Sequence, residues 1–555
     1  MARHRPAAAR DEHRLPRRRL RQYRRRLRQL LPAQSRLRAH LLDRRGDHGR
    51  DRILAPGERA GRGGDKSRGG GARPVNRTTL FHNSASLVAG RLLLSVGRLG
   101  AAVLVTRLAG VETFGSYALL LSLIALFEWL VDFGQTDIAA RDVAQHPARM
   151  AADLAALARA KAAMAILAAI ALPAGLALAR YPLPLVVAGA IGSVSIAFTA
   201  ALQPARVRVR ARMRIDLDVG AEIVGLVAML PLLGLAASAR MGPAMLIATL
   251  AVARAVQWAM LSRWSRTPVG PPAARGTWHD ARRLARAAAP LGAAGLLVVL
   301  YDALAPLMLS KLIDLHAVAL YAAAARFVFP VIIVVQAINN AFFVALSATW
   351  ARDRARFGEM QQTALTLSVG VAGVMFTGIH GASDFLMGLL GRDFVTAAPV
   401  LRLLAWVLLL RAVTTAMSPL IVIAGYQGRA LWLTLGSVVM QVAALLILVP
   451  RLGVAGAAVS YLLVELTLGT VAVSVIGQRV AGVRLDWGRT LAMLAIAAIV
   501  VVAIGASPIR GGFAGGVCAP IAFLIACLAT GVLSPTRLRR MRAALGHVPV
   551  LEAHA

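Results

Sequence analysis

The chain has 555 residues, of which 58% are hydrophobic, and its mean hydropathy is +0.64. This composition is too apolar for a water-soluble globule and argues against the soluble enzyme classes. The formal net charge of +37 does not indicate nucleic-acid binding, because the basic residues gather in a terminal segment and in the breaks between apolar stretches.

The N-terminal segment, residues 1–75, holds 23 Lys and Arg residues against seven Asp and Glu residues. It is poor in apolar residues and has no apolar core like that of a signal peptide. Because it cannot bury enough apolar surface to offset its ordering entropy, we expect a disordered basic tail. Such a tail suits an anionic inner leaflet; the alternative is a misassigned start, with translation beginning at Val75.

Fourteen apolar stretches follow, each about 20 residues long, which matches the roughly 30 Å hydrocarbon core of a bilayer when the stretch is helical. Their approximate limits are 83–106, 115–134, 156–178, 183–203, 218–238, 243–262, 287–309, 319–347, 363–380, 398–423, 431–449, 453–476, 490–506 and 513–532. We predict an all-α, polytopic integral membrane protein with about fourteen transmembrane helices. The alternative is twelve transmembrane helices, an even number that would also leave both termini on the same side of the membrane.

The breaks between these stretches alternate between arginine-rich and arginine-poor. One set carries 24 basic residues in total, and each break of the other set carries one. The single basic residues are Arg107, Arg180, Arg240, Lys311, Arg392, Arg451 and Arg510. Because cytoplasmic loops collect Lys and Arg, we expect a multi-pass protein of the bacterial cytoplasmic (inner) membrane with both termini in the cytoplasm.

The longest internal break follows the sixth stretch and divides the chain into six helices and eight. We expect a basic tail (1–75), a first six-helix lobe (76–265), a cytoplasmic linker (266–286), a second six-helix lobe (287–485), two additional helices (486–532) and a basic cytoplasmic tail (533–555).

An internal repeat supports two lobes of the same orientation. With a shift of 204 residues, the segment from Arg107 to Ala118 falls on the segment from Lys311 to Ala322. Each copy has a basic residue at the end of an odd span, a short loop, and a small-x-Tyr-Ala sequence that opens the next span. Parallel repeats of this kind are typical of transporters whose halves rock around a central site.

Short motifs in a consistent order cover residues 76 to about 480. They are the stretch from Asn83 to Arg91, the stretch from Arg107 to Tyr117, Asp132-Phe133-Gly134, the stretch from Tyr321 to Arg326, the stretch from Leu389 to Leu401 and the stretch from Val449 to Ala458. Together they resemble bacterial oligosaccharide and O-antigen flippases, which are polysaccharide biosynthesis proteins in the superfamily of multidrug exporters and peptidoglycan-precursor flippases.

The resemblance implies two six-helix lobes around a central cavity and transport of polyprenyl-pyrophosphate-linked oligosaccharide from the inner to the outer leaflet. The implied partners are that lipid-linked oligosaccharide, membrane lipids, and the polysaccharide polymerase and export machinery. We expect no nucleic-acid partner, cofactor or metal. Many members of the family carry Arg and Asp one turn apart in the seventh span, whereas this chain has only Asp302 there, in a displaced position.

Charged residues inside the apolar stretches are the candidate site. Arg91 and Arg98 lie seven residues apart on one helical face, so if both faced lipid the cost would be on the order of 5–7 kcal/mol. A cavity-facing cationic patch avoids that cost and suits a pyrophosphate, because guanidinium pairs with phosphate oxygens in two hydrogen bonds. The competing interpretation is that Arg91 snorkels to the inner interface and that Arg98 pairs with Asp132 for packing.

Acidic residues are the candidates for charge balance or ion coupling. Glu128 and Asp132 lie four residues apart on one face of the second span, and Asp302 occupies the position equivalent to Arg98 in the second half. This equivalence predicts a cavity that is basic on one side and acidic on the other.

Further intramembrane charges are Arg326, Arg411 and Glu465, of which we take the two arginines as additional cationic candidates. Arg326 lies near the outer end of the eighth span, where solvation by the loop is the competing explanation. For Arg254 and Glu222 we expect positions near the membrane interface.

Enzyme motifs are absent from the sequence: it has no G-x-x-x-x-G-K-[ST] loop, no H-E-x-x-H and no serine nucleophile elbow. We therefore predict a transporter with no catalytic residue. The alternatives are a cation-coupled multidrug exporter of the same superfamily and, behind it, a membrane-embedded glycosyltransferase or polymerase.

Overall fold

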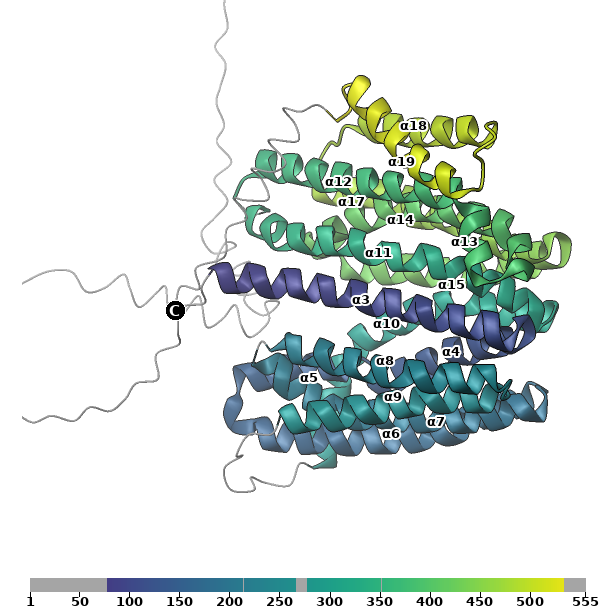
Figure 1. The fold of residues 1–555 in the computed structure, drawn as a ribbon. Helices are drawn as coiled ribbons and strands as arrows, with labels where there is room; N and C mark the ends of the chain where they lie inside the picture. The colour runs from purple at the N-terminus through teal and green to yellow at the C-terminus, as the bar shows by residue number, and fades with distance from the viewer. Residues whose placement is uncertain (1–76, 213, 266–276, 351, 534–555) are drawn as a thin grey trace, which may run out of the picture. The chain divides into compact units, whose positions relative to one another are not determined.

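The computed structural model describes residues 77–533, apart from 213, 266–276 and 351. The predicted tail at 1–75, residues 534–555 of the other tail and residues 266–276 of the linker lie outside the described residues. Every regular element in the described part of the chain is helical (Figure 1). Thirteen of the described helices are long and apolar enough to cross a membrane, and the shorter apolar helix α19 (Phe513–Ala529) follows them. These helices confirm the predicted all-α, polytopic fold.

The helices of the first half pack on one another and form what we term the first lobe. They are α3 (Arg77–Ala109), α4 (Val111–Asp132), α5 (Gln135–Gln145), α6 (Met150–Leu178), α7 (Leu183–Ala211), α8 (Ile215–Ser238) and α9 (Pro243–Trp264), with a 3₁₀ turn at Pro147–Arg149. Helix α7 packs between α6 and α9, while α8 packs between α9 and α3.

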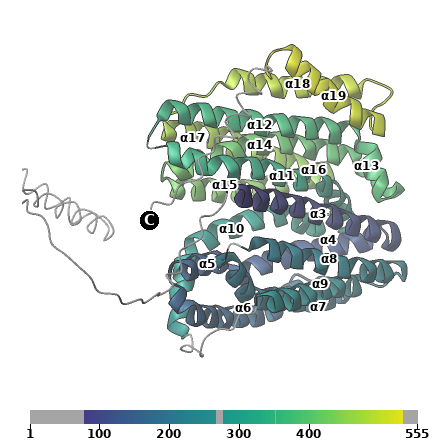
Figure 2. The same cartoon turned by 60° about the vertical axis from the view of Figure 1, so that its left-hand side comes forward.

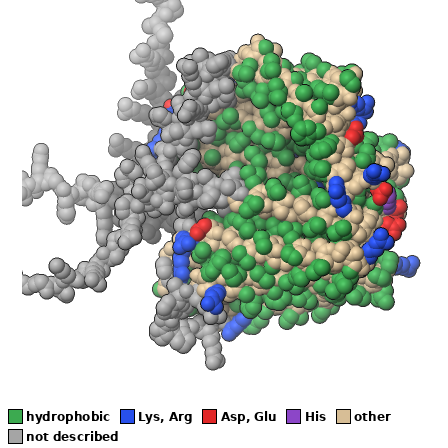
Figure 3. All heavy atoms as spheres, viewed as in Figure 1, with side chains coloured by type: hydrophobic (Ala, Val, Ile, Leu, Met, Phe, Trp, Pro, Cys, Tyr) green, Lys and Arg blue, Asp and Glu red, His purple; other side chains and the backbone are tan. Residues whose placement is uncertain are grey.

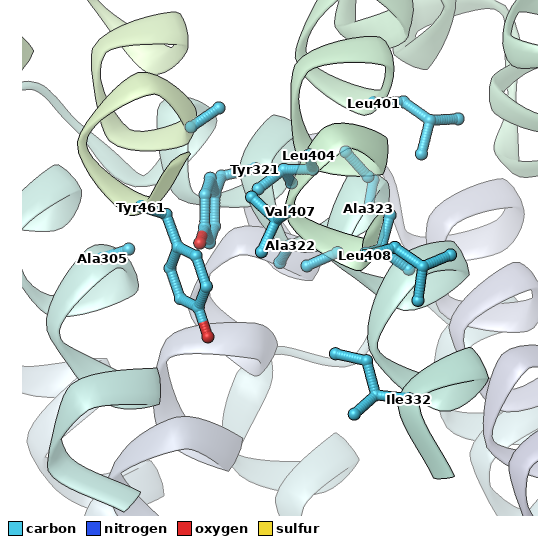
Figure 4. Packing of buried hydrophobic residues seen from close by; sticks show 14 of the residues in the cluster. Ala305, Tyr321, Ala322, Ala323, Ile332, Leu401, Leu404, Val407, Leu408 and Tyr461 are labelled. Atoms are coloured by element: carbon cyan, nitrogen blue, oxygen red, sulfur yellow. The ribbon is translucent and has the colours of Figure 1, made fainter. Parts of the chain in front are cut away.

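The helices that follow form the second lobe. They are α10 (Trp278–Leu312), α11 (Leu315–Thr349), α12 (Arg354–Gly381), α13 (Ser383–Leu390), α14 (Ala398–Ile423), α15 (Gln427–Leu452), α16 (Val454–Val464) and α17 (Val473–Ala481). A 3₁₀ turn (Arg392–Ala397) precedes α14, and a π-helical segment (Glu465–Ala472) joins α16 to α17. Helix α14 packs on α11 and α12. Figure 4 shows part of the buried cluster there, which includes Leu404 and Leu408 of α14 and Tyr321 of α11.

The last two helices, α18 (Trp487–Gly505) and α19, pack on each other and on α12. Both ribbon views place them on the side of α12 that faces away from the first lobe (Figures 1 and 2).

Two elements differ from the predicted boundaries. Helix α10 begins at Trp278 rather than at 287, because Thr277 and Asp280 form a capping box in which each side chain accepts from the other residue's backbone N–H. Helix α5 was not predicted, because its sequence is amphipathic and too polar to register as an apolar stretch. Residues 278–286 of the predicted linker are therefore helical.

The charged residues in the described loops gather at the two ends of the helices. On the face in Figure 3, hydrophobic side chains cover the band between them. We term the end that holds Arg149, Arg210 and Asp280 the arginine-rich end, and the end that holds Arg107 and Lys311 the arginine-poor end.

Helix α4 joins the two lobes, since it packs on both α10 and α11. At the arginine-poor end, a Cβ on Gly115 would lie 1.9 Å from the carbonyl oxygen of Leu315, so only glycine fits that approach. Toward the other end, the indole of Trp129 covers Gly295, and its Nε1 donates to the carbonyl oxygen of Gly292 at 3.1 Å.

Candidate functional site

A cavity of about 540 Å³ lies between the lobes, which we term the central cavity. Its wall comes from α3 and α4 of the first lobe and from α10, α11 and α14 of the second. Four charged side chains line it: Arg98, Asp302, Arg326 and Arg411. The structure thus brings Arg98 and Asp302, the two equivalent positions of the repeat, to one cavity.

A second cavity of about 290 Å³ adjoins the first and lies mainly within the first lobe, among α3, α4, α8 and α9; we term it the first-lobe pocket. Its charged lining consists of Arg98, Glu128, Glu222, Arg254 and Arg326. Because Arg98 and Arg326 line both cavities, they stand where the two spaces meet.

Both acidic residues of the first-lobe pocket are paired with arginines. Arg98 donates from Nη2 to Glu222, and Arg254 donates from Nη2 to Glu128 at 3.2 Å. The other Glu128 oxygen accepts from the Thr199 hydroxyl at 2.7 Å. The negative charges of this pocket are therefore neutralised within the protein.

A second network surrounds Arg411 in the second lobe. The Tyr461 hydroxyl accepts from Arg411 and donates to Asp302 at 2.9 Å, so it bridges the two charges. Arg411 Nη1 also lies 3.8 Å from Asp302 and 3.9 Å from Glu465, the first residue of the π-helical segment. Such segments interrupt the regular hydrogen-bond ladder and are frequent at functional sites.

Arg326 differs from these arginines because its guanidinium makes no hydrogen bond or ion pair with any described residue, although it lines both cavities. Helix α11 starts at Leu315, where the Asp314 side chain accepts from the N–H of Ala317 at 2.7 Å. Arg326 thus lies about three turns into the helix. The cavity, and not a loop, is therefore its immediate surrounding, which corrects the loop-solvation explanation.

Asp132 lines neither cavity, and its predicted alternative pairing with Arg98 is wrong. The buried ammonium of Lys161, 1% exposed, lies 3.1 Å from an Asp132 side-chain oxygen. It also donates to the backbone carbonyls of Val131 and Asp132 at 2.8 and 2.7 Å. Lys161 thus caps the end of α4 and neutralises Asp132, which leaves Arg98 free to pair with Glu222.

Arg91 also lines neither cavity, and its side chain is exposed on α3. Although it lies two helical turns before Arg98 on the same face, the cavities begin beyond it, at Leu94 and Ser95. Of the four cationic candidates, the structure brings Arg98, Arg326 and Arg411 together and leaves Arg91 outside.

Glu222 and Arg254, for which we expected positions near the membrane interface, both line the first-lobe pocket. Sequence reasoning missed Lys161 and Gln257 altogether. The available signal was that Lys161 and Gln257 both occur inside predicted apolar stretches, where a polar side chain needs a partner.

The charged side chains of this site are guanidinium groups and carboxylates. The two cavities together present four arginines against three carboxylates. Among the described residues there is no group of three His, Cys, Asp or Glu side chains that would hold a metal ion. An unpaired guanidinium in a cavity offers its full set of donors to an anion.

Comparison with solved structures defines the class of protein. The lipid II flippase MurJ, in an inward closed conformation, is 12% identical, with a TM-score of 0.64 over 80% of this chain and 97% of that one. An inward-facing multidrug resistance MATE family transporter of the MOP superfamily is 16% identical, with a TM-score of 0.58 over 71% of this chain and 98% of that one. The chain is a polytopic membrane protein whose fold is similar to that of these two transporters.

The sequence profile described as polysaccharide biosynthesis protein matches residues 80–350, which run from α3 through α11. This match confirms the resemblance to polysaccharide biosynthesis proteins that the motifs indicate. No curated protein sequence matches the chain.

Proposed function

We propose that the chain is a flippase that moves polyprenyl-pyrophosphate-linked oligosaccharide across the bacterial cytoplasmic membrane for assembly of a surface polysaccharide, such as O-antigen, capsule or exopolysaccharide. The single observation that carries this proposal is the unpaired guanidinium of Arg326 at the junction of the two cavities. The family match and the flippase neighbour agree with it.

The charge of the site favours an anionic ligand. A cation in a low-dielectric cavity is costly without a partner. Arg98, Arg254 and Arg411 have carboxylates within 4.0 Å, whereas Arg326 has none among the described residues. A pyrophosphate would supply the missing acceptors, with Arg98 close enough in the shared wall to contribute a second guanidinium.

The acidic candidates then serve as charge balance. In this proposal, Glu128 holds Arg254, Asp132 holds Lys161, and Asp302 balances Arg411 through the Tyr461 hydroxyl. Of the three, Asp302 is the coupling candidate, because it is the one that lines the central cavity and shares its partner with a second acid, Glu465.

The sidedness follows from the arginine distribution. The arginine-rich end would face the cytoplasm, so the substrate would enter from the inner leaflet and leave toward the arginine-poor end. The polymerase and export machinery would take the substrate there. Both termini would lie in the cytoplasm.

A cation-coupled drug exporter is the second candidate, because solved MATE transporters share the fold. Such an exporter would need an acid that is free to bind a cationic drug. Here Glu128, Glu222 and Asp302, the acids that line the cavities, are each hydrogen-bonded to an arginine or to Tyr461, while the group left free is a guanidinium. This distribution favours the flippase.

The proposal is tested by deleting the gene and measuring both surface polysaccharide and undecaprenyl-linked sugar on the cytoplasmic leaflet. The expected result is trapped lipid-linked sugar and lost surface polymer, rescued by the wild type and by Arg451→Ala but not by Arg326→Ala. Arg451 is a matched control because it is an exposed arginine at the end of α15 that lines neither cavity. Normal polysaccharide together with altered drug sensitivity would contradict the flippase and favour the exporter.

A further inference from the structure

Two residues that line the first-lobe pocket have buried hydrogen-bond donors with no acceptor among the described residues. Gln257 is 1% exposed, and its side-chain Nε2 has no partner among the described residues. Arg254 Nε, on the same helix, is also buried without a partner. Unsatisfied buried donors cost free energy, so each such group calls for an explanation.

The orientation of the Gln257 amide is set by its neighbour. Arg254 donates from Nη1 to Gln257 Oε1 at 3.1 Å, which places the oxygen toward Arg254 and leaves the amide NH₂ as the free group. The same arginine holds Glu128 with Nη2. The two free donors thus belong to the hydrogen-bonded network of Gln257, Arg254 and Glu128.

The ligand that satisfies them must bring oxygen acceptors. The acids of the pocket are already held, Glu222 by Arg98 and Glu128 by Arg254 and Thr199, so a cation finds no free carboxylate there. The remaining wall is mainly apolar, with Leu226, Met229 and Leu250 among its residues, and it also includes Tyr117. A few oriented polar groups in a mainly apolar wall are the usual design of a small-molecule subsite.

The volume and position fit a sugar ring. The pocket of about 290 Å³ corresponds to about ten liquid water molecules at ~30 Å³ each, which is room for a monosaccharide. It opens to the central cavity beside Arg326. A sugar attached directly to a pyrophosphate at Arg326 would therefore lie next to the pocket.

We propose that the first-lobe pocket binds the pyrophosphate-proximal sugar of the transported lipid, and that Gln257 and Arg254 donate hydrogen bonds to its hydroxyl or carbonyl oxygens. This proposal rests on the proposed function, since the pyrophosphate at Arg326 positions the sugar. Gln257 is then a specificity-determining residue of the first lobe, and Arg326 is the anchor for the phosphate.

The test compares two probes with the purified full-length chain in nanodiscs. One probe is undecaprenyl pyrophosphate without sugar, and the other is the undecaprenyl-pyrophosphate glycolipid extracted from the membranes of the deletion strain. The readout is the dissociation constant of each by native mass spectrometry. We expect the wild type to bind the glycolipid more tightly than the bare lipid.

Gln257→Leu should weaken binding of the glycolipid about 3- to 10-fold and leave the bare lipid unchanged, as the loss of a neutral hydrogen bond predicts. Gln257→Glu is the second variant, because it keeps an acceptor for Arg254 while it replaces the free donor by an acceptor oxygen and adds a negative charge; it should also abolish the preference for the glycolipid. Gln441→Leu is the matched control, since Gln441 is a buried amide with one unpartnered atom that lines neither cavity.

The outcomes separate this proposal from the proposed function. If wild type and both Gln257 variants bind the glycolipid equally well, the sugar subsite is wrong, even where Arg326→Ala loses both lipids. If the wild type binds neither lipid, or if Arg326→Ala binds both normally, the proposed function fails as well. An equal loss in Gln441→Leu would mean that the effect is on packing, and it would overturn the assignment.

Discussion

Arg107 and Lys311, which are equivalent positions of the 204-residue repeat, each bind a backbone carbonyl at a helix end in the opposite lobe. Arg107 of α3 donates from Nε to the carbonyl oxygen of Leu389 in α13 at 2.8 Å. Lys311 of α10 donates to the carbonyl oxygen of Ala179, the residue that follows α6, and its ammonium lies 3.4 Å from the Tyr181 ring centroid. The last carbonyls of a helix lack intrahelical partners and attract cations, so the pair forms a symmetric link across the arginine-poor end.

The first prediction is that Arg107→Ala together with Lys311→Ala opens the arginine-poor end. Without these two links the lobes separate more readily there, and the central cavity becomes accessible from that side. In cells carrying Ser122→Cys in the cavity wall, with Cys518 and Cys527 replaced by Ser, an impermeant maleimide should label the double variant several-fold faster. Equal labelling of the double variant and the parent protein would contradict the link, and Arg451→Ala serves as the control.

The second prediction concerns Gly115. Gly115→Ala places a Cβ against the Leu315 carbonyl at a distance that cannot be tolerated, so α4 and α11 must move apart at the arginine-poor end. In the same Ser122→Cys background, the labelling assay should show faster modification of the introduced thiol than in the parent. Gly100→Ala on α3 is the control, because a Cβ there meets nothing within 4 Å. If both substitutions behave alike, the close approach of α4 to α11 does not control access.

The third prediction concerns the buried pair of Lys161 and Asp132. Lys161→Met removes the counter-charge of Asp132, which keeps the Thr136 hydroxyl as a donor, and it takes the ammonium from two backbone carbonyls. Breaking a buried pair in this way costs about 3–5 kcal/mol. The melting temperature in detergent should therefore fall strongly. The double variant Lys161→Met with Asp132→Asn should recover part of the loss, because it removes the uncompensated charge. A single variant as stable as the wild type would show that the pair contributes nothing to stability.

The fourth prediction concerns Tyr461. Tyr461→Phe keeps the ring contact with Tyr301, whose centroid lies 4.8 Å away, and removes the hydroxyl that bridges Arg411 and Asp302. Because hydrogen bonds to charged groups contribute about 1.5–3 kcal/mol to stability, the melting temperature should fall, and transport should fall about tenfold or more because Arg411 and Asp302 lose their bridge. Surface-polymer yield at matched expression level measures the effect. Tyr426→Phe, at an exposed tyrosine before α15, is the control.

The sequence predicts the helices well because the length of an apolar stretch is a local property. All fourteen predicted stretches coincide with helices, whereas α5 and the first residues of α10 were missed, since capping and amphipathic packing do not raise mean hydropathy. The set of residues that share one face of a helix is also a local property, and from it we predicted that Arg98 faces the cavity.

The ion pairs could not be predicted, because each joins helices whose contact depends on the packed lobe. Arg254 and Glu128 are 126 residues apart, and Arg98 and Glu222 are 124 apart. Asp132 and Glu128 share a face of α4 but have different partners. Lys161 of α6 reaches Asp132 at the end of α4, whereas Arg254 of α9 binds Glu128. The unpaired state of Arg326 could be recognised only once every neighbour was in place.

The most direct test of the central claim is the affinity of the purified protein for undecaprenyl pyrophosphate, measured for the wild type, Arg326→Ala and Arg451→Ala. If the unpaired guanidinium holds the pyrophosphate, Arg326→Ala should bind at least tenfold more weakly, which corresponds to the loss of one charge-assisted hydrogen-bonded contact, and Arg451→Ala should match the wild type. Equal affinities for all three proteins would contradict the account, because Arg326 would then have no anionic partner in the cavity.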